Sequence, residues 1–413
     1  MNAPCHPRIA WIIPSADAGG IGPVAIETTS AATTHGAGDV TLIETHAAPR
    51  GDRIESGGLR RVVLDMGGTK APASVVLDWL RDNRPHVLFT NGVSHLEAIF
   101  PYIPDDTLHV AVLHDAARRY RHEIASYARY LDGVVAVSDY VFGWAQRDLR
   151  AAGFKGVVRR IHNGTGYPSP PSRADSASEL RLLFVGNIWH KGGSRLAGIA
   201  KALQRRGANF QLTVIADEAS QLQRRFARVG LQGRVNVIAR QSRTDLWRTY
   251  AAHDLLLMLS AGEPFGMVTI EAMGMGCVPV AYDVPSGTRE IIEPGLSGLL
   301  VRPNSDAVAA AIAALAPAQL SAMSAEAARR ARTLFCAERA AQEYMQLADD
   351  LVRCRDLVHR ARLPAQAAPL TARSRSYSPI ARLYHALPSA LRHQIRNALT
   401  AYPASFRWLR ERI

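Results

Sequence analysis

Two glutamates lie eight positions apart in the segment Gly262 to Val280, which directly follows an apolar run from Leu255 to Leu259. Pro-Phe-Gly follows Glu263, and Glu271 lies about two turns into a helix expected to begin near Phe265. The free N–H groups at the start of such a helix, and the positive end of its dipole, stabilise anions. The segment therefore predicts an anion site with an acidic neighbour, although Glu263 could instead only cap the helix.

A second stretch suited to binding an anion contains Gly186, Asn187, Lys191 and Gly192, after an apolar run that ends at Val185. Glycines let a backbone approach a phosphate closely, and a lysine adds a charge-assisted contact. Only four of the 49 basic residues are lysines, so a lysine at this turn differs from the arginine-rich background. The pattern favours a phosphate site over a solvated surface turn.

A glycine loop follows the first apolar run of the chain, at Gly19, Gly20 and Gly22. Together with Ala25, and with Glu44 at the end of the second apolar run, it also fits the fingerprint of a dinucleotide site. A glycine loop alone has low specificity, because an ordinary tight turn uses the same residues. An anion site is the favoured interpretation.

His114 and Asp115 follow the apolar run Leu108 to Leu113. The carboxyl end of a strand in an open α/β sheet faces the ligand crevice, so this position places an imidazole at the mouth of a cleft. A role in substrate contact and a plain helix cap remain open alternatives.

Apolar runs alternate with segments of helical length through most of the chain, which predicts βαβ units and parallel sheets. The expected strands of a first sheet are 9–13, 40–44, 62–65, 86–90, 108–113, 133–138 and 156–161. Those of a second sheet are 181–185, 210–215, 235–238, 255–259, 278–282 and 298–301. The fold class is α/β, with two doubly wound Rossmann-like domains that face an interdomain cleft.

Length and composition exclude several classes of protein. At 413 residues the chain predicts two or three domains, and 47% hydrophobic with 21% charged residues excludes a mainly disordered chain. No apolar run approaches the ~20 residues that span a bilayer, and no secretory signal is apparent, so we expect a cytoplasmic protein. The four cysteines are far apart, which argues against a disulfide scaffold and a zinc site.

Taken in order, these motifs resemble those of the retaining glycosyltransferases of family 4, which have the GT-B fold. The segment Glu263 to Val280 is similar to the Glu-x7-Glu motif of that family. The resemblance covers roughly residues 8 to 358, and other parts agree in order: Gly19-Gly20, His114-Asp115, Val137-Ser138, Asn163-Gly164, Gly186 to Gly192, and Gly287 to Glu290.

The resemblance implies transfer of a sugar from a nucleotide diphosphate sugar with retention of anomeric configuration. The sugar nucleotide is a co-substrate, and neither a cofactor nor a metal is implied, since the chain contains no Asp-x-Asp. Glu263, His114 and Lys191 would then be the catalytic residues, with Glu263 and His114 against the transferred sugar. Donor binding is expected from Gly19, Gly20, Asn187, Lys191, Arg195, Phe265, Gly266, Met267, Val268 and Glu271, of which Glu271 would bind the ribose hydroxyls.

One position departs from the family pattern. The family usually has an arginine where this chain has Asn187, with a lysine five residues later, whereas Lys191 comes four residues later. Loss of one charge-assisted contact costs roughly 1.5–3 kcal/mol. Arg195, one helical turn beyond Lys191, is a candidate to replace the missing charge.

We expect the following organisation of the chain: an acceptor-side domain at 1–167, a Pro/Ser-rich linker at 168–178 and a nucleotide-sugar domain at 179–335. A helix at 336–359 is expected to cross back to the first domain, and an arginine-rich tail occupies 360–413. The net charge is +13, and the tail contains ten arginines and one glutamate, a net +9. Its apolar residues recur at helical spacing, so residues 378–413 predict either contact with an anionic membrane or packing on the protein.

The function predicted from sequence is a glycosyltransferase that adds a sugar from a UDP- or GDP-sugar to a polysaccharide or lipid-linked glycan. Its place would be the cytoplasm, or peripherally the inner face of the plasma membrane, and no nucleic-acid partner is expected. Two alternatives remain: a degenerate scaffold that binds a sugar nucleotide or glycan without catalysis, and an NAD(P)-dependent oxidoreductase built on Gly20, Gly22 and Ala25.

Overall fold

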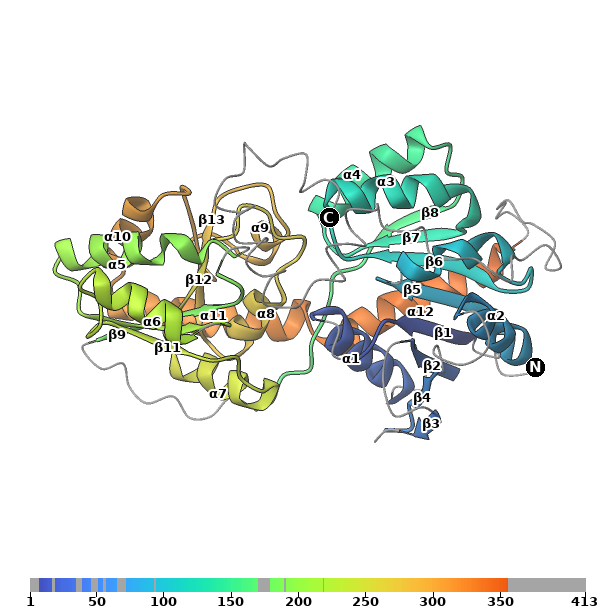
Figure 1. The fold of residues 1–413 in the computed structure, drawn as a ribbon, viewed down its shortest axis with the longest axis horizontal. Coiled ribbons are helices and arrows are strands. Elements are labelled where there is room, and N and C mark those ends of the chain that lie inside the picture. Colours follow the sequence, from blue (N-terminus) through green and yellow to red (C-terminus); the bar gives the residue numbers. More distant parts are fainter. Residues whose placement is uncertain are drawn as a thin grey trace.

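Two α/β units lie side by side in the computed structural model of the chain (Figure 1). The structure describes residues 7–16, 19–34, 39–45, 51–54, 57–64, 72–92, 94–169, 179–188, 191–217 and 219–355. The tail at 360–413 and most of the linker lie outside these residues.

The first unit is an eight-stranded sheet in the order β3-β4-β2-β1-β5-β6-β7-β8. Its strands are β1 (Arg8–Ile13), β2 (Asp39–Glu44), β3 (Gly51–Ile54), β4 (Arg60–Val63), β5 (Val87–Asn91), β6 (Leu108–Leu113), β7 (Gly133–Ala136) and β8 (Val157–Arg160). Its helices are α1 (Ile21–Thr34), α2 (Pro72–Asn83), η1 (Ser94–Tyr102), α3 (Arg118–Tyr127), η2 (Ala128–Tyr130) and α4 (Asp139–Ala151). The inner strands are buried on both faces, as expected for a parallel sheet covered by helices.

The second unit is a six-stranded sheet in the order β11-β10-β9-β12-β13-β14, in which every pair of neighbours is parallel. Its strands are β9 (Leu180–Val185), β10 (Phe210–Ile215), β11 (Val235–Ile238), β12 (Leu255–Met258), β13 (Val278–Tyr282) and β14 (Leu299–Val301). The helices between them are η3 (Gly193–Arg195), α5 (Leu196–Arg205), α6 (Ala219–Arg228), α7 (Arg243–Ala252), α8 (Met267–Gly274) and α9 (Thr288–Ile291).

Three further helices, α10 (Ser305–Ala313), α11 (Pro317–Leu334) and α12 (Ala337–Arg353), complete the described chain. The last helix packs on α1 of the first unit (Figure 1). There the buried ring of Tyr344 lies 4.6 Å from Trp11 and 5.4 Å from Phe89, centroid to centroid. Aromatic burial of this kind fixes α12 to the first domain.

The predicted fold class is confirmed, since both sheets have the doubly wound parallel order. One strand was not predicted: β3 pairs antiparallel with β4 at the sheet edge. Its four residues, Gly-Asp-Arg-Ile, have no apolar run from which a strand could be predicted. The helix expected near Phe265 begins two residues later, at Met267.

Within the described residues, no single helix is long and apolar enough to cross a membrane. Helices α10 and α11 meet that test only as a pair, bent by 105° at the break between them.

Candidate active site between the two domains

A cavity of about 570 Å³ lies where the carboxyl ends of strands from both sheets meet. Residues after β5 and β6 line it from the first domain, and residues after β9 and β12 line it from the second. The cavity therefore lies where ligands bind in doubly wound sheets. Nine predicted site residues border it: Gly19, Gly20, His114, Lys191, Glu263, Phe265, Gly266, Met267 and Val268.

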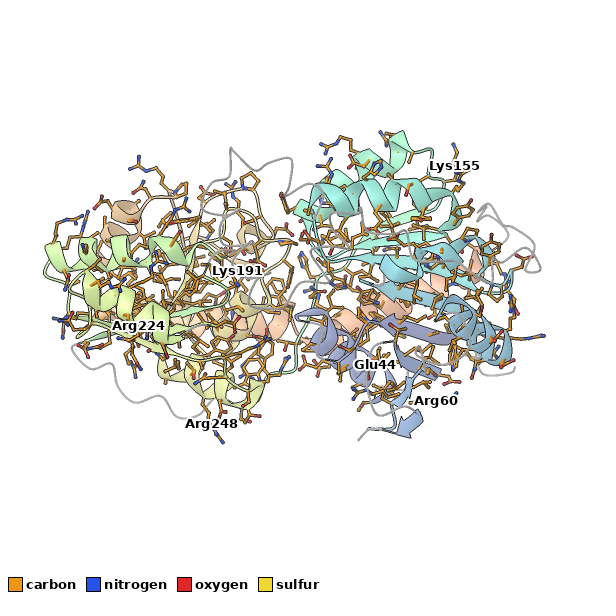
Figure 2. The ribbon with its side chains drawn as sticks, viewed as in Figure 1. Glu44, Arg60, Lys155, Lys191, Arg224 and Arg248 are labelled. Carbon is orange, nitrogen blue, oxygen red and sulfur yellow. The ribbon has the colours of Figure 1, made fainter. Side chains whose placement is uncertain are left out.

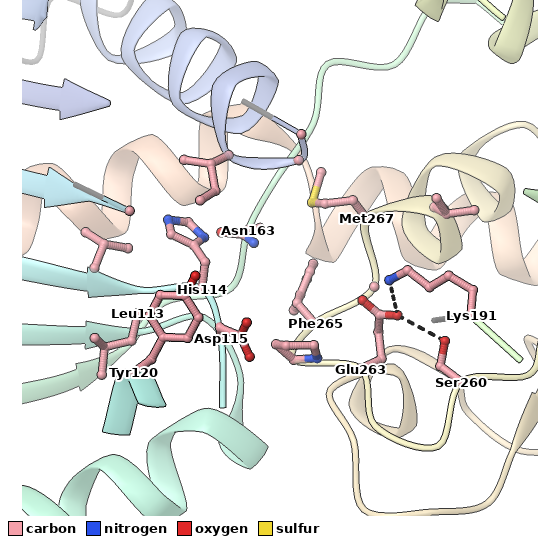
Figure 3. Close-up of a pocket in the computed structure, with 18 of the residues that line it drawn as sticks. Leu113, His114, Asp115, Tyr120, Asn163, Lys191, Ser260, Glu263, Phe265 and Met267 are labelled. Carbon is pink, nitrogen blue, oxygen red and sulfur yellow. Dashed lines mark hydrogen bonds and ion pairs between the residues drawn. The ribbon is translucent and has the colours of Figure 1, made fainter. Parts of the chain in front are cut away.

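Lys191 and Glu263 form an ion pair in the wall of this cavity (Figure 3). Lys191 Nζ lies 2.6 Å from Glu263 Oε2, which also accepts a hydrogen bond from Ser260 Oγ at 3.3 Å. Glu263 is only 8% exposed. The two lysines labelled in Figure 2 differ in position: Lys155 projects at the outer edge of the first domain, whereas Lys191 lies among the side chains of the second domain.

Hydrogen bonds to two backbone carbonyls hold the loop that contains Glu263. Its carbonyl accepts a hydrogen bond from the N–H of Gly287 at 2.7 Å. The next carbonyl, that of Pro264, accepts from Ser138 Oγ of the first domain at 2.5 Å. The loop ends at Gly266, whose φ of +116° favours glycine, and α8 then begins with its N-terminus at the cavity. The cation, the carboxylate and the helix N-terminus thus meet in one place.

His114 borders the cavity from the first domain, at the end of β6 (Figure 3). Its Nε2 lies 2.9 Å from Oδ1 of Asn91, the last residue of β5. Burial lowers the pKa of His114 to about 4, so the imidazole is neutral at pH 7. A neutral imidazole offers one donor and one acceptor rather than a positive charge.

The glycine loop of the first domain lies against the start of α8. A Cβ at Gly20 would lie 3.7 Å from the side chain of Met267, and one at Gly22 would collide with the carbonyl of Ala16 at 2.0 Å.

Glu44, the acidic residue of the dinucleotide fingerprint, is engaged in contacts inside the first domain. Glu44 is fully buried, accepts from the N–H of Ala16 at 2.6 Å and pairs with Arg61. Glu44 is therefore not presented to a ribose.

Three predicted donor-binding residues do not line the cavity. The carbonyl of Asn187 accepts from the N–H of Lys191 at 2.8 Å and so closes the turn that presents this lysine. Arg195 places its guanidinium over the ring of Tyr282, 5.2 Å from the centroid. The charge that Arg195 was expected to supply is therefore directed to Tyr282.

Glu271 lies in a polar cluster beside the cavity. Tyr250 donates to its Oε2 at 3.0 Å, and the guanidinium of Arg243 lies 3.7 Å from its Oε1. Burial raises the pKa of Glu271, and Arg243 opposes the shift. Arg243 also pairs with Glu27 of the first domain at 2.7 Å, so this cluster joins the two domains. The expected contact of Glu271 with a ribose stays a prediction.

Three residues of the site were not predicted from the sequence as site residues. Asn91 is the last residue of β5, and Ser260 lies shortly after the end of β12. Both could have been found by listing the polar residues at the carboxyl end of every predicted strand. Asn163 was noted only as part of a resembling motif. It lines the cavity, is 5% exposed, and its Oδ1 has no hydrogen-bond partner among the described residues.

Asp139, His162 and Glu290 form a separate cluster whose possible ligand atoms all lie within 4.8 Å of one another. Other groups already engage them: Glu290 accepts from the N–H groups of Asp139 and Tyr140, and Arg160 lies 3.0 Å from Asp139. We interpret the cluster as a contact between the domains rather than a metal site.

A known family model matches the region that contains the second domain. Residues 171–332 match the family model of glycosyl transferases group 1. This stretch includes Lys191 and Glu263, the ion pair of the cavity. The whole fold is GT-B, as predicted from the sequence.

Curated relatives match part of the chain at modest identity. A lipopolysaccharide 1,6-galactosyltransferase of Salmonella typhimurium is 30% identical over 165 residues, which is 38% of this chain and 45% of the relative. A GDP-mannose:cellobiosyl-diphosphopolyprenol alpha-mannosyltransferase of Xanthomonas oryzae is 26% identical over 165 residues, 38% of this chain and 43% of the relative. The chain thus spans less than half the length of these two relatives.

Solved structures match more of the chain. Sucrose-phosphate synthase of Thermosynechococcus elongatus has a TM-score of 0.70 at 20% identity, over 84% of this chain and all of that chain. HepE of Anabaena, solved with UDP and glucose, has a TM-score of 0.66 at 20% identity, with the same coverage. At this identity the likeness concerns the fold.

Proposed function

We propose that the protein is a retaining glycosyltransferase that moves a sugar from a nucleotide diphosphate sugar to a polysaccharide or lipid-linked glycan. The observation that supports this most strongly is the position of Lys191, 2.6 Å from Glu263 and beside the N-terminus of α8 at the interdomain cavity. Lys191, Glu263 and the start of α8 all lie within residues 171–332, which match the model of glycosyl transferases group 1.

Cleavage of the anomeric C–O bond leaves negative charge on the departing diphosphate. Lys191 and the free N–H groups at the start of α8 would stabilise that charge where it develops. The acceptor oxygen forms the new C–O bond, and its proton passes to the diphosphate oxygen that leaves. Because the positive charge comes from these groups, we expect the step to need no metal ion.

The acceptor class is proposed from the relatives, one named for lipopolysaccharide and one for a diphosphopolyprenol. The names of the comparison proteins include both UDP and GDP-mannose, so either nucleotide remains a candidate.

We also propose a peripheral position at the cytoplasmic membrane. Flotation with anionic liposomes, with and without residues 361–413, tests it. An unchanged distribution would contradict it.

A thermal-shift panel tests the function directly. UDP, GDP, ADP, their sugar conjugates and NAD(P) are compared, with and without EDTA, since a ligand at 100 times its Kd stabilises by about 2.7 kcal/mol. A shift with one sugar nucleotide, lost in Lys191→Ala and kept in EDTA, is expected. A shift with NAD(P) alone would overturn the proposal. Binding of a sugar nucleotide without turnover would favour the degenerate scaffold.

A further inference from the structure

We infer that Asn91 is a positioning residue that fixes His114 as a hydrogen-bond acceptor toward the cavity, so that the bound sugar must present an O–H or N–H group there. The inference rests on the proposed function for the identity of the ligand. Its first part, the state of the imidazole, concerns the protein alone.

The orientation of the Asn91 amide follows from its two contacts. Oδ1 lies 2.9 Å from His114 Nε2, and Nδ2 donates to the carbonyl of Ile12 at 3.5 Å. Exchanging the two ends of the amide would place Oδ1 against the Ile12 carbonyl, which brings two acceptors together. Asn91 is 1% exposed, so water does not relieve such a clash. Oδ1 therefore faces the histidine and needs a donor there.

His114 supplies that donor from Nε2. A neutral imidazole has one N–H, so a proton on Nε2 leaves Nδ1 with a lone pair. Nδ1 has no hydrogen-bond partner among the described residues, and His114 borders the cavity. The unpartnered, buried Oδ1 of Asn163 lies in the same wall. This wall of the cavity thus offers acceptors, which suit a hydroxyl-bearing sugar and disfavour a carboxylate.

Other charges face the imidazole across the cavity and from its own wall. The titratable side chains that line the cavity are Glu97, Asp115, Tyr120, Glu123, Lys191, Arg240 and Glu263. The acids favour an imidazolium and the two cations oppose it. Burial is the largest effect on the pKa of His114, and it keeps the ring neutral.

The test is ¹⁵N NMR of the histidine ring nitrogens in the full chain, which distinguishes a protonated from an unprotonated nitrogen directly. His114→Gln assigns the signals. In the wild type at pH 7 we expect a proton on Nε2 of His114 and none on Nδ1. A proton on Nδ1, or a mixture of both forms, would overturn the inference.

His109 provides an internal reference in the same spectrum. Its Nδ1 lies 3.4 Å from the carbonyl of Tyr130, and its Nε2 lies 3.0 Å from Thr90 Oγ1. A carbonyl only accepts, so His109 should bear its proton on Nδ1, opposite to His114. Opposite results for His109 and His114 would show that the spectrum distinguishes the two imidazole tautomers in this protein.

Asn91→Leu is close in shape and removes the amide oxygen that accepts from Nε2 of His114. Without that acceptor nothing holds the proton of the neutral ring on Nε2. We therefore expect the signals of His114 in this variant to show protonation of Nδ1 in part or in full. Asn236→Leu, on the exposed face of β11, is the matched control and should leave the signals of His114 unchanged.

Kinetics connect the tautomer to the sugar. For a sugar nucleotide that the wild type uses, Asn91→Leu should lower kcat/KM about threefold or more, while Kd for the free nucleoside diphosphate stays within about twofold. The wild type should prefer a neutral hexose over the hexuronate of the same nucleotide, and the variant should lose part of that preference. Unchanged kcat/KM with an altered tautomer would refute the role in sugar recognition. If no sugar nucleotide binds, the proposed function fails, and the NMR result still decides the tautomer.

Discussion

Glu290 of the second domain accepts a hydrogen bond from the backbone N–H of Asp139, the first residue of α4 in the first domain, at 2.7 Å. The other oxygen of Glu290 accepts from the N–H of Tyr140 at 2.8 Å. A carboxylate at this position serves as a cap for a helix of the opposite domain. The residue before α4, Ser138, donates to the carbonyl of Pro264, so the same junction holds the loop of Glu263.

Replacing Glu290 by alanine should loosen this junction. The first two N–H groups of α4 lose their partner, which costs about 1 kcal/mol of stability. The loop of Glu263 then loses part of its support, and we expect kcat to fall about three- to tenfold. Small-angle X-ray scattering should show a more open average arrangement of the domains.

Two other variants make the Glu290 result specific. Glu290→Gln keeps one acceptor oxygen and should fall between the wild type and the alanine variant. Glu343→Ala removes a carboxylate that, among the described residues, pairs only with Arg339 of the same helix, and should change neither kcat nor scattering. Equal effects of Glu290→Ala and Glu343→Ala would contradict the role of the junction.

Lys191→Ala and Glu263→Ala should each lower turnover of the sugar nucleotide at least tenfold, because a charge-assisted contact is worth roughly 1.5–3 kcal/mol. For Lys191→Ala the free energy of unfolding should change by about 1 kcal/mol or less, because the Lys191 side chain is 37% exposed. Turnover assays and thermal unfolding measure the two effects separately. Lys201→Ala, on the exposed side of α5, is the control. Turnover near that of the wild type in either site variant would remove that residue from the mechanism.

Gly192→Ala should reduce donor binding about tenfold or more. Gly192 has a φ of +77°, and a Cβ there would lie 2.0 Å from the carbonyl of Leu259, so the turn that presents Lys191 must move. Gly207 has a similar φ of +69° with nothing within 4 Å of a Cβ. Gly207→Ala should therefore cost only about 1–2 kcal/mol of stability and leave binding intact. Calorimetric titration of both variants compares them, and equal loss of binding in the two would show that backbone strain alone is responsible.

The desolvated imidazole of His114 predicts a specific dependence of stability on pH. Its pKa is about 4 in the folded protein, against about 6.5 when exposed, so the unfolded chain binds more protons between these values. Stability due to this group is therefore present above pH 6.5 and is lost as the pH falls toward 4, by about 3 kcal/mol in total. Urea unfolding of the wild type and His114→Gln at several pH values isolates the effect. A constant difference between the two proteins from pH 7 to 4 would show that His114 is not buried as described.

The sequence by itself determined the two parallel sheets and the residues at the ends of their strands. Apolar runs such as Leu108 to Leu113 specify buried strands locally, and a parallel sheet aligns their carboxyl ends at one edge. His114, Lys191 and Glu263 could therefore be placed at a cleft before any contact was known. The edge strand β3 was missed because pairing with β4, rather than its own composition, makes it a strand.

Only the tertiary structure decided which of these side chains meet. Glu271, although eight residues from Glu263, lies beside Tyr250 and Arg243 instead of in the cavity wall, because Glu263 lies in the loop before α8 whereas Glu271 lies within α8. The contacts of Asn91 with His114 and of Glu290 with Asp139 join residues 23 and 151 positions apart. Sequence periodicity indicates which face of a helix or strand is buried. The residue that a side chain contacts in the other domain depends on how the two domains pack.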